Sequence, residues 1–190
     1  MNKRILSGSS EAIARAIKII NSSGVIVYPT DTLYGFGGNA SDKIAIDKIN
    51  IIKNRKAPMS VLVSNVQMAL CISDLTDKEK DVFIKYFGGA NTIIVKARKG
   101  ALCPQLLGPD ESVGIRMPDH PFGKKLVKTL NYPITTTSVN RTGELPLNDP
   151  DEIIKQFRNE IDLLIDEGVL PRSKGSSIYK LKNTTLTKIR

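Results

Sequence analysis

The sequence predicts an α/β domain in which helices cover both faces of a mixed β-sheet, with α+β character late in the chain. Three observations support this prediction. Helical and strand patterns alternate along most of the 190 residues, and strand patterns follow one another only near the end. A chain of this length with 41% hydrophobic residues can bury a core without a disulfide or a metal. No repeat, low-complexity tract or linker divides it, so we expect a single domain over residues 1–190.

Each predicted helix combines an apolar stripe with a start signal or a stop signal. Ser10 is a candidate N-cap for the first helix, which has an isoleucine stripe. Thr76 and Glu79 have the spacing of a capping box. Asp149 followed by Pro150 is typical of a helix start. The predicted helices cover residues 11–22, 42–52, 76–87, 121–130 and 149–157.

The predicted strands are short apolar or alternating runs with turn-forming residues at their ends. The clearest of them follows Gly24 and stops at Pro29. No strong helical pattern separates the last three runs, which gives the end of the chain its α+β character. The predicted strands cover residues 25–28, 59–63, 91–97, 112–117, 133–138, 161–165, 176–181 and 185–189.

Charge and cysteine content narrow the possible functions. The 28 basic and 19 acidic residues give a net charge of +9, which favours nucleic acid, a nucleotide or phosphate as partner. Cys71, Cys103 and the single histidine, His120, form neither a disulfide framework nor a zinc pattern. No apolar run approaches the ~20 residues that span a bilayer, and the first residues lack a signal-peptide core. We therefore expect a cytoplasmic protein without membrane contact.

Polar side chains gather where predicted strands end, which is where α/β sheets usually bind ligands. Residues 28–35 leave a buried strand, carry hydroxyls and a carboxylate, and then reach a glycine. The alternative is a tight turn in which Thr30 and Asp31 satisfy local backbone amides. Residues 135–140 end another strand with hydroxyls and an amide, which suits a nucleotide or a metal-bound phosphate as well as a polar sheet edge. Arg116 ends a strand and could pair with a carboxylate, either of a ligand or within the protein.

A cluster of cations and a glycine-rich segment are also candidates. Lys53, Arg55 and Lys56 follow the second predicted helix, where they either complement its dipole or clamp a polyphosphate. Residues 35–40 fit the loose Gly-x-Gly-x-x-Gly/Ala pattern, without the preceding strand or the later acid of a dinucleotide site. We expect a glycine loop that allows the backbone to approach a ligand closely.

Five motifs in this order resemble the YrdC family of threonylcarbamoyl-AMP synthases. They are Pro-Thr-Asp-Thr-Leu-Tyr-Gly at 29–35, Lys-x-Arg at 53–55, Arg-Met-Pro-x-His-Pro at 116–121, Ser-x-Asn at 138–140, and Gly-Ser-Ser at 175–177 with a final Ile-Arg. The resemblance covers about residues 25–190. It implies a three-layer YrdC-like domain with a twisted mixed sheet and a basic cavity.

The resemblance also implies an activity and its participants. The family consists of nucleotidyltransferases that join L-threonine, bicarbonate and ATP, with Mg2+ accompanying ATP, into threonylcarbamoyl-AMP and pyrophosphate. The product serves threonylcarbamoyl-adenosine modification of tRNA through a downstream tRNA threonylcarbamoyl transferase complex. A carbamate formed on threonine would itself attack the α-phosphorus, so catalysis would need positioning and charge stabilisation and no protein nucleophile.

Residue roles follow from the resemblance position by position. Lys53, Arg55, Ser138 and Asn140 match the catalytic signature around ATP. Ser112 and Arg190 match further nucleotide contacts. The positions that hold threonine are matched by Thr32, Arg116 and Ser176. No side chain is assigned to a metal.

The sequence departs from the family pattern at two places, and two other functions remain open. Residues 88–92 replace a frequent Pro-Gly-Pro-x-Thr, and a frequent histidine falls near Leu62. A non-catalytic RNA-binding module using the basic cavity would explain the net charge, although the chain has no tryptophan and no RNA-stacking motif. A carbamoyl-transfer domain of the hydrogenase-maturation type would be part of a longer chain with cysteine-rich zinc fingers.

Overall fold

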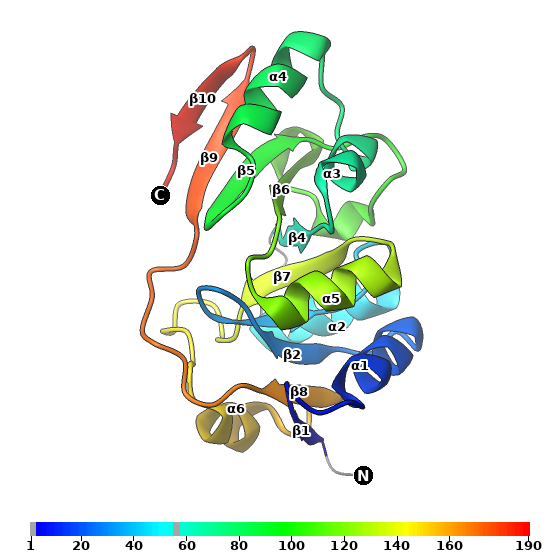
Figure 1. The fold of residues 1–190 in the computed structure, drawn as a ribbon, viewed down its shortest axis with the longest axis vertical. Coiled ribbons are helices and arrows are strands. Elements are labelled where there is room, and N and C mark those ends of the chain that lie inside the picture. The colour runs from blue at the N-terminus through cyan, green and yellow to red at the C-terminus, as the bar shows by residue number, and fades with distance from the viewer. Residues whose placement is uncertain (1–2, 55–57) are drawn as a thin grey trace.

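The computed structural model describes residues 3–54 and 58–190, and within them ten strands form one twisted mixed sheet (Figure 1). The strands lie in the order β1-β8-β2-β3-β7-β4-β6-β5-β9-β10. Their bounds are β1 Arg4–Leu6, β2 Ile26–Pro29, β3 Tyr34–Gly37, β4 Ser60–Leu62, β5 Asn91–Lys96, β6 Ser112–Arg116, β7 Ile134–Ser138, β8 Leu163–Asp166, β9 Ser177–Lys182 and β10 Thr185–Lys188. The helices are α1 Ala12–Asn21, α2 Lys43–Lys53, α3 Val66–Ile72, α4 Asp77–Tyr86, α5 Pro121–Leu130 and α6 Pro150–Phe157, with 3-10 turns at Pro104–Leu106 and Pro109–Glu111.

Helices cover both faces of the sheet around β8, β2 and β3, which confirms the three-layer prediction for that part of the sheet. Successive residues of a strand point to opposite faces. Ile26 of β2 therefore packs with α1 and α5, whereas its neighbour Val27 packs with α2 and α6 in a separate apolar cluster. The larger cluster also takes in α3 and α4, which cover one face of the β4–β6–β5–β9 end of the sheet.

The strand directions show why the sheet is mixed. β2 and β3 form an antiparallel hairpin, and β8 lies parallel to both β1 and β2. β9 lies parallel to β5 and returns as an antiparallel hairpin with β10. The chain between β8 and β9 runs along one side of the molecule from one end of the sheet to the other (Figure 1). The late strands thus enter the sheet at two distant positions.

Most predicted elements are present, with differences at their ends. The capping box of Thr76 and Glu79 is formed, and Asp149 caps α6 through its side chain. Ser10 does not cap α1, because Glu11 occupies the N-cap position and makes no side-chain capping bond. The short strand β1 and helix α3 were not predicted. No helix in the described residues is long and apolar enough to cross a membrane.

The glycine-rich segment is a strand, which corrects the prediction of a ligand loop. Gly35 and Gly37 belong to β3, which pairs with both β2 and β7. A Cβ at Gly37 would lie 2.6 Å from Cε1 of Tyr28, so this glycine makes room for a buried ring. Of the glycines in this segment, Gly35 borders the cavity described below, and Gly37 and Gly38 do not. Glycine is required at Gly37 for packing within the protein and not for contact with a ligand.

Candidate active site

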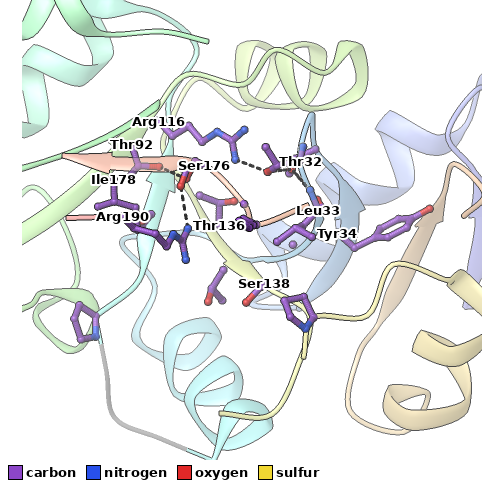
Figure 2. Close-up of a pocket in the computed structure, with 18 residues that line it drawn as sticks. Thr32, Leu33, Tyr34, Thr92, Arg116, Thr136, Ser138, Ser176, Ile178 and Arg190 are labelled. Carbon is purple, nitrogen blue, oxygen red and sulfur yellow. Dashed lines mark hydrogen bonds between the residues drawn. The ribbon is translucent and has the colours of Figure 1, made fainter. Parts of the chain in front are cut away.

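A polar cavity of about 320 Å3 brings together five of the predicted site residues (Figure 2). The β2–β3 turn, the ends of β6 and β7, the segment before β9 and the end of the chain all contribute to its wall. The predicted residues that line it are Thr32, Arg116, Ser138, Ser176 and Arg190. Segments far apart in the sequence thus converge on one small site, at the low end of the ~300–1,000 Å3 range for ligand pockets.

In the β2–β3 turn, Thr30 bonds the local backbone and Asp31 pairs with a distant side chain. The Thr30 hydroxyl accepts from the backbone nitrogens of Thr32 and Leu33, at 3.2 and 3.1 Å, and donates to the Leu33 carbonyl at 2.7 Å. The tight-turn alternative is therefore right for Thr30. It is wrong for Asp31, whose carboxylate accepts from Arg116 at 2.6 Å.

Arg116 pairs with a carboxylate within the protein, which is one of the two roles that the sequence left open. It ends β6 and is only 4% exposed, and its guanidinium forms an ion pair with Asp31. A second donor, Nη1, reaches the Thr32 hydroxyl at 3.0 Å. The same side chain lines the cavity, so Arg116 belongs to an internal ion pair and to the site wall (Figure 2).

Ser176 and Arg190 meet at the other side of the cavity. The Ser176 and Thr92 hydroxyl oxygens lie 2.7 Å apart, and the Arg190 guanidinium donates to the Ser176 carbonyl at 3.1 Å (Figure 2). The carbonyl of Ile178 accepts from the backbone nitrogens of both Ile189 and Arg190, at 2.7 and 3.3 Å. Two residues thus oppose one, as in a β-bulge, and Arg190 is turned toward the cavity.

Lys53 and Asn140 do not line the cavity but support the loop that does. The Lys53 ammonium is inside the protein, and the residue is 2% exposed. It donates to the Ser138 carbonyl at 2.6 Å, and to the carbonyl and the side-chain oxygen of Asn140 at 3.0 and 2.9 Å. The Asn140 side-chain oxygen also accepts from the Ser138 hydroxyl at 2.6 Å. Lys53 and Asn140 together hold Ser138 in position at the end of β7.

Ser112 and His120 are not among the described residues that line the cavity. Arg55 lies outside the described residues. Ser112 begins β6, at the opposite end of that strand from Arg116. The His120 ring caps α5, because Nδ1 accepts from the backbone nitrogen of Phe122 at 3.2 Å. Burial lowers the pKa of His120 below its usual value.

The structure adds cavity residues to which the sequence analysis assigned no role. Thr92 lies on β5, where a polar residue inside an apolar strand was the available signal. Lys174 precedes the Gly-Ser-Ser motif and is exposed. Tyr34 lies on β3, and its hydroxyl donates to the Gly168 carbonyl at 2.8 Å. Burial raises the pKa of Tyr34 to about 12, so this hydroxyl stays protonated and tethers the segment before β9.

The charges of the wall favour an anionic ligand. The charged side chains among the described lining residues are all cationic: Arg116, Lys174 and Arg190. The described residues contain no cluster of three His, Cys, Asp or Glu side chains that could hold a metal ion. Thr136 and Ser138 of β7, which share one face of the strand, place neutral hydroxyl-bearing side chains in the same wall (Figure 2). Such a wall suits phosphate or carboxylate groups, with any divalent cation held largely by ligand oxygens.

Comparison with known proteins places the chain in a family. Residues 18–190 match the Sua5/YciO/YrdC family model, which is described as "Telomere recombination". A putative threonylcarbamoyl-AMP synthase of Methanocaldococcus jannaschii is 33% identical over 175 residues, covering 91% of this chain and 82% of that protein. A threonylcarbamoyl-AMP synthase of Bacillus subtilis is 30% identical over 169 residues, covering 86% of this chain. The matched region is about half, 48%, of that relative's length.

Solved structures agree with this relationship. Escherichia coli YciO superimposes with a TM-score of 0.86 at 26% identity, covering 98% of this chain and 92% of that one. P. abyssi Sua5 complexed with L-threonine superimposes with a TM-score of 0.85 at 24% identity, covering 94% of this chain and 53% of that one, and shows the shared fold. Since the family model spans nearly the whole chain and the fold agrees, the chain belongs to the Sua5/YciO/YrdC family.

Proposed function

We propose that the chain is an L-threonylcarbamoyladenylate synthase, a nucleotidyltransferase that joins L-threonine, bicarbonate and ATP. The observation that carries the proposal is the convergence of Thr32, Arg116, Ser138, Ser176 and Arg190 on one polar cavity. Those residues were chosen from sequence motifs separated by up to 158 positions, and a chance set would not share one wall. The names of the curated relatives support the same activity.

The reaction balances without a protein nucleophile. Bicarbonate takes up a proton and loses water to give carbon dioxide, and the threonine amine adds this carbon dioxide and releases a proton to form a carbamate. A carbamate oxygen then attacks the α-phosphorus of ATP while pyrophosphate leaves. The wall would supply positioning and charge stabilisation. Lys174 and Arg190 would attract the phosphates, and Arg116, Thr32 and Ser176 would hold the amino acid.

The remaining predicted residues take supporting roles in this proposal. Lys53 and Asn140 would act on ATP through Ser138, whose position they hold. Direct phosphate contact by Arg55 and nucleotide contact by Ser112 stay predictions. Mg2+ would enter with ATP and neutralise phosphate charge. Its protein contacts would be hydroxyls such as that of Ser138, because the described lining contains no carboxylate.

Pyrophosphate release tests the proposal directly. The purified chain, given ATP, Mg2+, threonine and bicarbonate, should release pyrophosphate, and omission of threonine or bicarbonate should abolish the release. Serine should be used roughly 10-fold less well, because it lacks one methyl group that the cavity can contact. Equal release without any amino acid would refute the proposal. The product would pass in the cytoplasm to a tRNA threonylcarbamoyl transferase complex.

Direct contact with RNA is a second candidate, favoured by an uncovered sheet face. Ile93 and Leu181 pack in the core, and because successive strand residues point to opposite faces, their neighbours Ile94, Lys180 and Lys182 lie on the other face. Ile94 pairs with Lys180, so these side chains share the face that continues into the cavity at Ile178. We propose that this face contacts tRNA phosphates. Binding of a labelled tRNA should then fall steeply as the salt concentration rises, and it should weaken when Lys180 and Lys182 are both replaced by glutamine. Unchanged tRNA binding by this double variant would refute the proposed RNA contact.

A further inference from the structure

The Arg116 guanidinium is held by a carboxylate that is not itself part of the cavity wall. Nη2 donates to Asp31 at 2.6 Å, and Nη1 donates to the Thr32 hydroxyl at 3.0 Å. The Arg116 and Asp31 side chains are only 5% and 18% exposed. Arg116 and Thr32 are among the described lining residues, and Asp31 is not. Asp31 therefore acts on a ligand in this cavity through Arg116.

The turn does not need the Asp31 carboxylate for its own stability. An aspartate in such a turn ordinarily bonds local backbone amides. Here Thr30 takes the amides of Thr32 and Leu33, so the Asp31 carboxylate points across the sheet. Strands β7 and β4 lie between β3 and β6 in the sheet order, and the ion pair spans them. The ion pair with Arg116, 85 positions away, therefore explains a carboxylate at this position better than a role in the turn does.

The pair divides the cavity into two electrostatically different ends. A carboxylate in contact with a shielded guanidinium cancels most of its charge locally. Lys174 and Arg190, the other cations of the described lining, form no salt bridge within the described residues. One end of the cavity is thus a neutral set of hydrogen-bonding groups, and the other end is cationic.

The Thr32 hydroxyl completes the neutral end. Its oxygen accepts from Arg116, so its proton points elsewhere. The Thr30 oxygen lies 3.3 Å from that of Thr32, but it already accepts from two backbone nitrogens and donates to the Leu33 carbonyl, so its lone pairs are occupied. An oxygen of a bound ligand is therefore the better acceptor for the Thr32 proton. The neutral end can therefore both donate to and accept from an uncharged hydroxyl.

We infer that Asp31 is a positioning and specificity-determining residue, which orients Arg116 and cancels its charge so that this end of the cavity takes an uncharged hydroxyl. The inference rests on the proposed function, in which that hydroxyl is the side chain of threonine and the phosphates of ATP lie toward Lys174 and Arg190. Without the carboxylate, Arg116 would be a shielded, uncompensated cation that competes for anionic groups.

The test replaces Asp31 with asparagine, which has nearly the same shape. In Asp31→Asn, the KM for threonine should rise about 10-fold or more, while the KM for ATP changes less than about twofold. Sulfate, used as an anion probe, should inhibit this variant at about fivefold lower concentration than the wild type. Asp119→Asn is the matched control, because its exposed carboxylate pairs with Lys124 beside the site. Asp119→Asn should leave the KM for threonine, the KM for ATP and the inhibitory sulfate concentration within about twofold of the wild-type values.

The double variant Asp31→Asn/Arg116→Gln separates this role from a purely structural one. It removes both charges of the pair, so it folds even where the single variant leaves a buried charge. Its sulfate sensitivity should return to the wild-type level, while its threonine KM stays raised. The inference would be wrong if the double variant had the wild-type KM for threonine, or if it kept the raised sensitivity to sulfate. It would also be wrong if Asp31→Asn left both the threonine KM and the sulfate inhibition unchanged. Absence of threonine-dependent pyrophosphate release by the wild type would instead refute the proposed function, and the inference with it.

Discussion

Replacing Lys53 with methionine separates a lysine that supports the site from one that contacts phosphate. Methionine keeps the apolar stem and removes the ammonium, so the Ser138 carbonyl and both Asn140 oxygens lose a donor. The Asn140 side-chain oxygen keeps the Ser138 hydroxyl as a second donor. Loss of a donor costs about 1–3 kcal/mol for each buried acceptor, and removal of the buried charge offsets part of the total. We expect Lys53→Met to destabilise the ligand-free protein by about 2–4 kcal/mol.

Thermal unfolding without ligand measures this cost. For a domain of this size 1 kcal/mol corresponds to about 2–4 °C, so Lys53→Met should melt roughly 4–16 °C below the wild type. Lys174→Met is the control, because Lys174 is an exposed lysine of the cavity wall. It should melt within about 2 °C of the wild type and raise the KM for ATP. If Lys53→Met melted at the same temperature as the wild type, the Lys53 ammonium would not stabilise the loop. Lys53 would then be better explained as a residue that contacts the ligand directly.

Three further substitutions test the site and the fold. Arg190→Ala should weaken ATP binding by about 1–3 kcal/mol in calorimetric titration and leave threonine binding without ATP nearly unchanged; unaltered ATP affinity would remove Arg190 from the nucleotide site. Because burial lowers the pKa of His120, the unfolded chain takes up the proton first and native stability falls as the pH drops below about 6.5. His120→Asn, which keeps a capping side chain, should flatten the dependence of melting temperature on pH between about 7 and 5. Gly37→Ala should cost about 1–3 kcal/mol, measured by denaturant unfolding, because its Cβ would meet the Tyr28 ring at 2.6 Å.

Elements with strong local signals could be predicted from the sequence. The capping box of Thr76 and Glu79 and the start of α6 at Asp149 depend on residues within one helical turn of each other, and both formed as expected. β3 was missed because its glycines lack the β-branched residues that mark a strand. Glycine is needed at position 37 because the Tyr28 ring packs against it, and this contact is set by strand pairing.

Part of the candidate site could likewise be predicted from the sequence, and part depends on contacts between distant residues. The resemblance to the family assigned Thr32, Arg116, Ser138, Ser176 and Arg190, all of which line the cavity. Polar runs at predicted strand ends by themselves indicated only the segments 28–35 and 135–140 and Arg116. The sequence could not show that Lys53 lies under Ser138 or that Asp31 meets Arg116. Each of these contacts joins residues about 85 positions apart, and spacing along the chain carries no information about which of them meet.

By itself, the sequence determined the alternation of helices and strands, the position of the polar strand ends and the cationic character of the chain. The tertiary structure decided which of those side chains face the cavity. Periodicity and capping act within a few residues, so they can be predicted locally. Strand order and register act over the whole chain, and a change of one residue in register turns a side chain to the other face. Arg190 shows this most clearly, because the bulge opposite Ile178 and a hydrogen bond to the Ser176 carbonyl hold its guanidinium at the cavity.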